Sequence, residues 1–115
     1  MILYGIPNCD TVKKARAWLG EQGFDYTFHD FKKQGVEAAL LAGWVDQLGW
    51  EKLVNKAGTT WRRLEPARQA QVVDAASAIE LMIEQPSLIK RPVLVRDGQV
   101  TLGFTPDHYA ALFGR

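Results

Sequence analysis

The chain has 115 residues, of which 47% are hydrophobic and 23% charged, and its 14 basic and 13 acidic side chains leave a net charge of +1. This length suits one domain with a packed core, and the composition excludes an intrinsically disordered chain. The nearly neutral charge argues against a nucleic-acid or anionic-membrane partner. No apolar run is long enough to cross a bilayer and no signal-peptide pattern is present, so we expect a cytoplasmic protein, and we expect it to be a monomer.

The first thirty residues have the pattern of a strand, a helix and a second strand. The apolar run from Met1 to Ile6 is closed by the turn residues Pro7-Asn8, which is typical of a buried strand. Residues 10–20 repeat their apolar positions with the period of an amphipathic helix, and residues 24–31 alternate as a half-buried strand does. Two strands joined by a helix in this way are expected to be parallel with a right-handed crossover.

Residues 35–86 have helical rather than strand-like spacing. We expect two main helices, separated near Gly58-Thr59-Thr60, and Pro86 is expected to end the second because proline cannot continue a helix. The apolar positions that carry this prediction are Val36, Leu40, Trp44 and Leu48 in the first helix, and Val72, Ala76, Ile79 and Ile83 in the second.

The last twenty-odd residues predict a hairpin and a closing helix. A β-rich run over 92–95 is followed by the hairpin signal Asp97-Gly98, a returning strand over 99–103 and a helix over 106–113. The whole order predicts an α/β protein with a thioredoxin-like fold. We expect a four-stranded mixed sheet, built from βαβ and ββα halves, within a single domain over 1–115 that carries a helical insertion over about 35–86.

Cys9 is the only cysteine, so the chain cannot form an internal disulfide and lacks the companions of a structural zinc site. No metal and no tightly bound cofactor are expected. Cys9 lies between the turn Pro7-Asn8 and a helix beginning near Asp10, where backbone N–H groups of the first turn and the Thr11 hydroxyl can stabilise a thiolate. The alternative, that Cys9 packs as a small buried hydrophobe, stays open on this reasoning.

Three segments in order resemble the glutaredoxin-related arsenate reductase family, which also includes the Spx-type regulators. Leu3–Ala15 resembles its active-site opening, Gly58–Arg62 its glycine-to-arginine loop, and Leu88–Val93 its arginine-proline motif before the third strand. The similarity spans nearly the whole chain. It is greatest to a branch of small arsenate-reductase-like proteins proposed to act as glutathione-dependent thiol reductases.

This resemblance implies roles for five residues. Cys9 matches the catalytic cysteine, and Arg62 and Arg91 match two arginines that bind an oxyanion and hold the thiolate. Pro92 is expected to follow a cis peptide bond, and Pro92 and Thr11 are expected to contact glutathione or the substrate backbone.

Two departures from the family pattern refine the expected function. Phe104 stands where an arsenate reductase presents a third arginine, and Val12 stands where an Spx-type redox switch has a second cysteine. We therefore expect an oxidoreductase that is weak or inactive on arsenate. It would use glutathione as cosubstrate on a small-molecule or protein disulfide, because no second thiol is present to resolve an adduct on Cys9. A true arsenate reductase and an Spx-like regulator that binds RNA polymerase are the alternatives.

Overall fold

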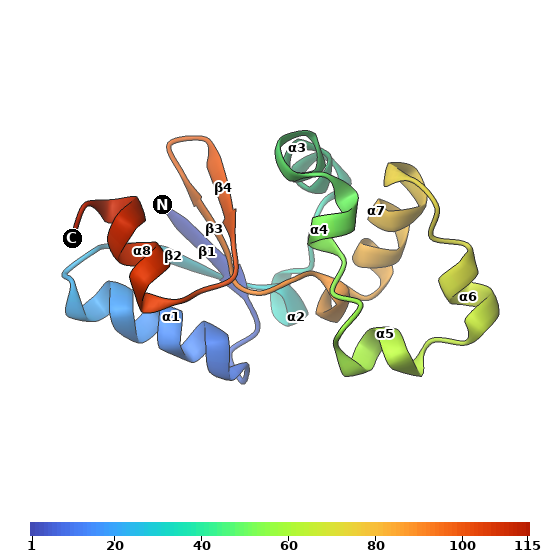
Figure 1. Ribbon diagram of the computed structural model, residues 1–115, viewed down its shortest axis with the longest axis horizontal. Helices are drawn as coiled ribbons and strands as arrows, with labels where there is room; N and C mark the ends of the chain where they lie inside the picture. The colour runs from blue at the N-terminus through green and yellow to red at the C-terminus, as the bar shows by residue number, and fades with distance from the viewer. The chain divides into compact units, whose positions relative to one another are not determined.

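A computed structural model describes all 115 residues, and the chain divides into two compact units. One unit combines Met1–Asp30 with Arg91–Arg115, and the other is the intervening segment Phe31–Lys90. Figure 1 shows that the first holds the sheet and the second is helical. The helical unit begins and ends a few residues outside the predicted insertion over 35–86.

The sheet of the first unit has four strands in the order β2-β1-β3-β4. β1 and β2 are parallel, with Gly5 opposite Asp30, whereas β1 with β3 and β3 with β4 are antiparallel. The predicted mixed sheet of a thioredoxin-like fold is thus confirmed. The strands are β1 (Ile2–Gly5), β2 (Thr27–Asp30), β3 (Val93–Arg96) and β4 (Gln99–Leu102).

The predicted hairpin turn is present between β3 and β4. Asp97 and Gly98 both have positive φ, 51° and 78°, and they connect the paired residues Arg96 and Gln99. Two left-handed residues between paired strands match the twist of the hairpin, which explains the aspartate-glycine pair.

Two helices, α1 (Asp10–Glu21) and α8 (Pro106–Phe113), pack on one face of this sheet. Their shared core is fully buried and consists of Leu3, Ala15, Leu19, Leu94 and Tyr109. Thr105 caps α8 by accepting a hydrogen bond of 3.1 Å from the His108 backbone N–H, and Gly114 ends it with a φ of 68°. The β1-α1 connection that carries Cys9 therefore rests on a packed scaffold.

The Tyr109 hydroxyl is buried in this core without a hydrogen-bond partner, and burial raises the pKa of Tyr109. An unpaired buried hydroxyl is costly, so Tyr109→Phe is expected to raise the free energy of unfolding by about 1 kcal/mol. Urea denaturation measures this as a higher midpoint with an unchanged slope. A lower midpoint would contradict the prediction, because it would mean that the hydroxyl has a stabilising partner.

The second unit contains two longer helices, as predicted, and four short ones that the apolar spacing of the sequence does not distinguish. Gly49, with φ of 88°, divides α3 from α4, and Asp74 starts α7 through a capping box with Ser77. The longer helices contact each other. The helices are α2 (Phe31–Gln34), α3 (Ala38–Leu48), α4 (Trp50–Leu53), α5 (Thr59–Arg63), α6 (Pro66–Ala70) and α7 (Ala75–Glu84), with a 3-10 turn over Pro86–Leu88.

None of the helices of the chain combines the length and apolar character that a membrane crossing needs.

Candidate functional site

Cys9 is the residue that caps the N-terminus of α1, as the sequence predicts. Its backbone is extended, with φ of −90° and ψ of 127°, and its carbonyl accepts the first helical hydrogen bond from the Lys13 N–H at 2.9 Å. Its own N–H donates to the Ile6 carbonyl at 3.2 Å, which closes the turn after β1. The side chain is half-buried, so the sulfur is neither a core atom nor fully hydrated.

Gly5 sets how closely the end of β1 approaches the first turn of α1. A Cβ added to Gly5 would lie 2.8 Å from Cγ2 of Val12, a fully buried residue, so the backbone or the valine would have to shift. From the sequence, Gly5 is predicted only as part of a strand. A glycine at the last position of a strand, four residues before the reactive cysteine, was the available signal of this close approach.

Three groups stabilise the thiolate form of Cys9. Partial burial raises the pKa of the Cys9 thiol, but the Val12 backbone N–H, the Arg91 guanidinium and the Thr11 backbone N–H together outweigh burial and hold the pKa below its ordinary value. Arg91 acts on the thiolate both as a hydrogen-bond donor and through its positive charge. The half-buried setting and the lowered pKa favour a thiolate over a thiol packed as a small hydrophobe, and the reactivity of Cys9 stays a prediction.

Arg91 and Pro92 reach the same site from the start of β3. The peptide bond between them is cis, which confirms the prediction, and Pro92 is buried while Arg91 is half-buried. The Pro92 carbonyl accepts a hydrogen bond of 2.9 Å from the Gly103 N–H, just beyond the end of β4. The structure thus brings together Cys9, Thr11 and Arg91, three of the residues that the family resemblance selects.

Arg62 belongs to the helical unit and is described there. It lies in α5, its backbone N–H donates to the Gly58 carbonyl at 3.3 Å, and its guanidinium donates to the Ala57 carbonyl of the same loop. This contact leaves other N–H donors of the guanidinium for a ligand. A role of Arg62 in anion binding stays a prediction.

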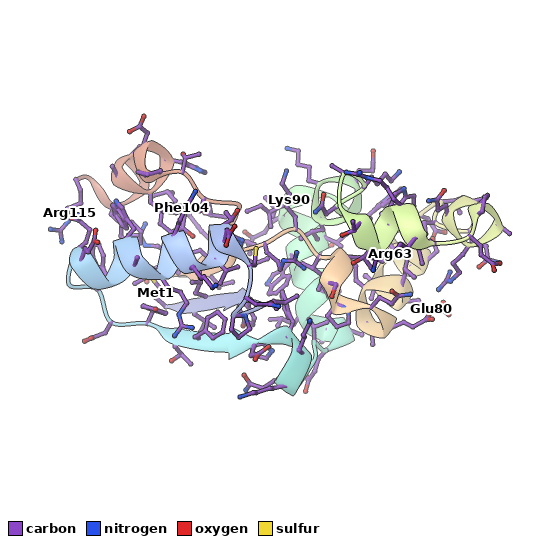
Figure 2. All side chains as sticks on the ribbon, turned by 90° about the horizontal axis from the view of Figure 1, so that it is seen from below. Met1, Arg63, Glu80, Lys90, Phe104 and Arg115 are labelled. Atoms are coloured by element: carbon purple, nitrogen blue, oxygen red, sulfur yellow. The ribbon has the colours of Figure 1, made fainter.

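Phe104 is a packing residue of the sheet unit (Figure 2). Its ring meets the Tyr109 ring edge-on, with centroids 4.6 Å apart. The position that would carry a third arginine in an arsenate reductase therefore adds apolar contact to the core and supplies no donor for an oxyanion.

The chemistry available at this site is that of one nucleophilic sulfur beside one guanidinium. Nowhere in the chain do three or more His, Cys, Asp or Glu side chains gather in a way that could hold a metal ion. Val12, at the position of a second redox cysteine, is fully buried between β1 and α1. A covalent adduct on Cys9 must therefore be resolved by a thiol from outside the chain.

The depressed pKa of Cys9 predicts a distinct pH profile for its alkylation by iodoacetamide. Because the thiolate is the reacting form and it persists to lower pH, the midpoint of the rate should lie below that of a free thiol. Arg91→Gln should raise the midpoint and lower the rate near neutral pH by about threefold to tenfold. Arg96→Gln is the matched control, because Arg96 lies at the far end of β3 and its guanidinium binds the Leu112 carbonyl at 3.1 Å. Equal effects of the two substitutions, or a midpoint like that of a free thiol, would contradict the assignment.

Comparisons with known proteins identify the family and agree with the fold. The model of the ArsC family matches residues 4–112. A solved structure named YFFB protein is 52% identical, with a TM-score of 0.90 over 96% of both chains. An arsenate reductase related protein from Brucella melitensis is 54% identical, with a TM-score of 0.77 over 97% of this chain and 92% of that one. An uncharacterised protein of Haemophilus influenzae is 40% identical over 96% of both chains. The mixed sheet, the cysteine at the start of α1 and a family match over nearly the whole length lead to one conclusion: this chain belongs to the ArsC family.

Proposed function

We propose that this protein is a glutathione-dependent thiol reductase in which Cys9 is the only nucleophile. The observation that carries the proposal is the depressed pKa of the Cys9 thiol, caused by Val12, Arg91 and Thr11, in a chain without a second cysteine. Such a thiolate can attack a disulfide but cannot resolve the adduct itself. Glutathione, the abundant thiol of the cytoplasm in which we expect the protein to act, supplies the second thiol.

The proposed cycle has two thiol-disulfide exchanges. In the first, the Cys9 thiolate attacks the glutathione sulfur of a mixed disulfide, a Cys9-glutathione disulfide forms, and the substrate leaves as a thiolate that takes a proton from water. In the second, a glutathione thiolate attacks the glutathione sulfur of that adduct, glutathione disulfide leaves and the Cys9 thiolate is restored. The substrate is reduced by two electrons, and two glutathione units end as one disulfide.

The residues around Cys9 have separate proposed roles in this cycle. The first-turn N–H groups of Thr11 and Val12 stabilise Cys9 as the leaving thiolate of the second exchange, since a lower pKa makes a thiol leave faster. Arg91 does the same and also attracts the anionic attacking thiolate. Pro92 and Thr11 would contact the glutathione or substrate backbone, and for Arg62 the family resemblance supports a role in anion binding.

The same residues account for a low proposed activity on arsenate. Arsenate is multiply charged, and in the sheet unit Arg91 is the guanidinium that acts on Cys9, while Phe104 is packed on Tyr109. One guanidinium compensates a single negative charge on a thiolate better than the several charges of an oxyanion.

A regulator is the second candidate, because the chain is also 24% identical to a global transcriptional regulator Spx of Streptococcus pyogenes, over 98% of this chain and 84% of that protein. A regulator of that kind would bind RNA polymerase without turning over a thiol. Binding of purified bacterial RNA polymerase together with an absence of glutathione-linked turnover would favour this candidate over the enzyme.

Intact mass spectrometry combined with steady-state kinetics tests the proposed function. The reduced protein is mixed with a glutathionylated small-molecule disulfide, and a Cys9-glutathione adduct is expected to appear. Added glutathione should remove the adduct and produce glutathione disulfide repeatedly. An adduct that glutathione does not resolve, or no adduct at all, would contradict the proposal.

A further inference from the structure

The helical unit holds an open pocket of about 340 Å³ that the thiol chemistry does not use. It is lined by Thr60, Arg63, Leu64, Gln85 and Ser87. The first two residues come from α5 and the third follows it, whereas Gln85 directly follows α7 and Ser87 lies in the 3-10 turn. Residues that carry two hydroxyls, one amide and one guanidinium therefore line the pocket from two separate segments of the same unit.

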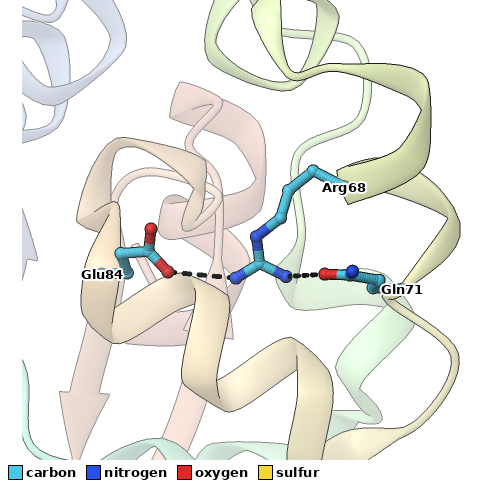
Figure 3. A network of polar contacts seen from close by, with 3 residues as sticks. All are labelled: Arg68, Gln71 and Glu84. Carbon is cyan, nitrogen blue, oxygen red and sulfur yellow. Dashed lines mark hydrogen bonds and ion pairs between the residues drawn. The ribbon is translucent and has the colours of Figure 1, made fainter.

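Arg63 differs from the other arginines of the helical unit in having no partner. Arg68 binds the Glu84 carboxylate at 3.0 Å and the Gln71 side-chain oxygen at 3.1 Å (Figure 3), and Arg62 donates to the Ala57 carbonyl. Arg63, labelled in Figure 2, is exposed, and its side chain makes no hydrogen bond or ion pair within the chain. The guanidinium that lines the pocket is thus the one whose donors are all available to a ligand.

We propose that this pocket is a binding site for a small organic carboxylate, with Arg63 as its charged anchor. Arg63 is the only charged residue among the lining side chains, so the site matches one negative charge. A guanidinium binds a carboxylate through two parallel N–H donors, whereas a phosphate dianion would leave one charge uncompensated. Thr60 and Gln85 add neutral donors and acceptors beside that charge.

The size and lining of the pocket favour a ligand in which the carboxylate belongs to an amino-acid-like or peptide-like molecule. A volume of about 340 Å³ lies at the lower end of small-molecule sites and exceeds what a bare anion needs. The Gln85 amide and the Thr60 hydroxyl can pair with an amide group, and Leu64 offers apolar contact to a short side chain. The ligand class is therefore a carboxylate that carries a neighbouring amide.

Titrations followed by two-dimensional amide NMR test this site on the full, reduced chain. The probes are N-acetylglycine, acetate and inorganic phosphate at constant ionic strength. N-acetylglycine is expected to shift the signals of Thr60, Arg63 and the Gln85 side-chain amide, and to bind more tightly than acetate or phosphate. Tighter binding of phosphate, or the absence of shifts at these residues, would overturn the proposal.

Two substitutions distinguish specific binding in the pocket from general attraction of an anion to a positively charged surface. Arg63→Gln should weaken N-acetylglycine binding by at least about tenfold, because a charge-assisted hydrogen-bond pair is lost. Lys52→Gln is the matched control, since it removes one exposed charge of the same unit from outside the pocket and should leave the affinity unchanged. Equal weakening by both substitutions would refute the site. Cys9→Ser should bind N-acetylglycine like the unaltered protein, so that a failure of the pocket and a failure of the thiol chemistry are separate results.

Discussion

Replacing Cys9 by serine is expected to reduce glutathione-linked disulfide reduction to the uncatalysed rate. The chain has no other sulfur nucleophile, because Cys9 is its only cysteine, and a serine hydroxyl at the same position does not ionise near neutral pH. The oxygen of the serine would stay neutral. The Val12 and Thr11 N–H groups and Arg91 would then have no anion to stabilise. Both the adduct and the turnover should disappear in the same assay.

Two controls make this loss specific to the thiol. The Cys9→Ser protein should keep the urea midpoint of the unaltered chain to within a small margin, because the side chain is only half-buried and makes no capping hydrogen bond. Arg96→Gln should retain turnover, since Arg96 binds the Leu112 carbonyl at the far end of β3. Residual turnover by Cys9→Ser above the uncatalysed rate would show that the nucleophile is elsewhere.

Local signals along the chain predicted the sheet unit well. The first helix and the last were expected over 10–20 and 106–113, and they are Asp10–Glu21 and Pro106–Phe113. Their ends are marked in the sequence itself, by the turn Pro7-Asn8 before Cys9 and by Thr105-Pro106 before the closing helix. Where turn or capping residues mark the start of a helix, they agree with the apolar spacing, and the predicted bounds lie close to the observed ones.

The helical unit was predicted less well because its helices are short. A helix of four or five residues, such as α4 or α5, is stabilised mainly by packing against its surroundings. It is too short to show a period of its own, so the apolar spacing does not distinguish it from the neighbouring helices. In α7 the predicted apolar positions included Ile79 and Ile83, but Ile83 is 41% exposed. The buried positions are Ala78, Leu81 and Met82, because the face that is buried is decided by packing of α7 against α3 and the 3-10 turn.

The sequence predicts which single residues of the site are chemically suited to it, but not how their side chains are arranged. A lone cysteine at a strand-to-helix turn indicates a thiolate, and the family pattern selects Arg91 as its partner. The spacing of residues along the chain does not reveal that the Phe104 ring packs on Tyr109, or that Arg63 rather than its neighbour Arg62 lines a pocket. Both facts depend on the direction of a side chain, which only the folded chain defines.

Introducing an arginine at position 104 is expected to raise arsenate reduction while adding less to disulfide reduction. The Gly103 N–H donates to the Pro92 carbonyl at 2.9 Å, which ties the segment before Phe104 to the cis-proline loop that carries Arg91. A guanidinium on this segment can add charge-assisted hydrogen bonds to an oxyanion, whereas a disulfide substrate has no comparable charge to receive them. The unaltered protein should turn over arsenate poorly.

The substitution also removes a packed ring, so its two effects must be separated. Phe104 contacts the buried Tyr109 edge-on, and its loss should lower the free energy of unfolding by about 1–3 kcal/mol. Phe104→Gln is the matched control, because it loses the same ring contact and adds no charge. We expect Phe104→Arg alone to gain arsenate turnover, measured with glutathione well below the unfolding temperature, while both variants lose a similar amount of stability. Efficient arsenate turnover by the unaltered chain would refute this account, and equal gains of Phe104→Arg on arsenate and on a disulfide would show that position 104 does not face the anion.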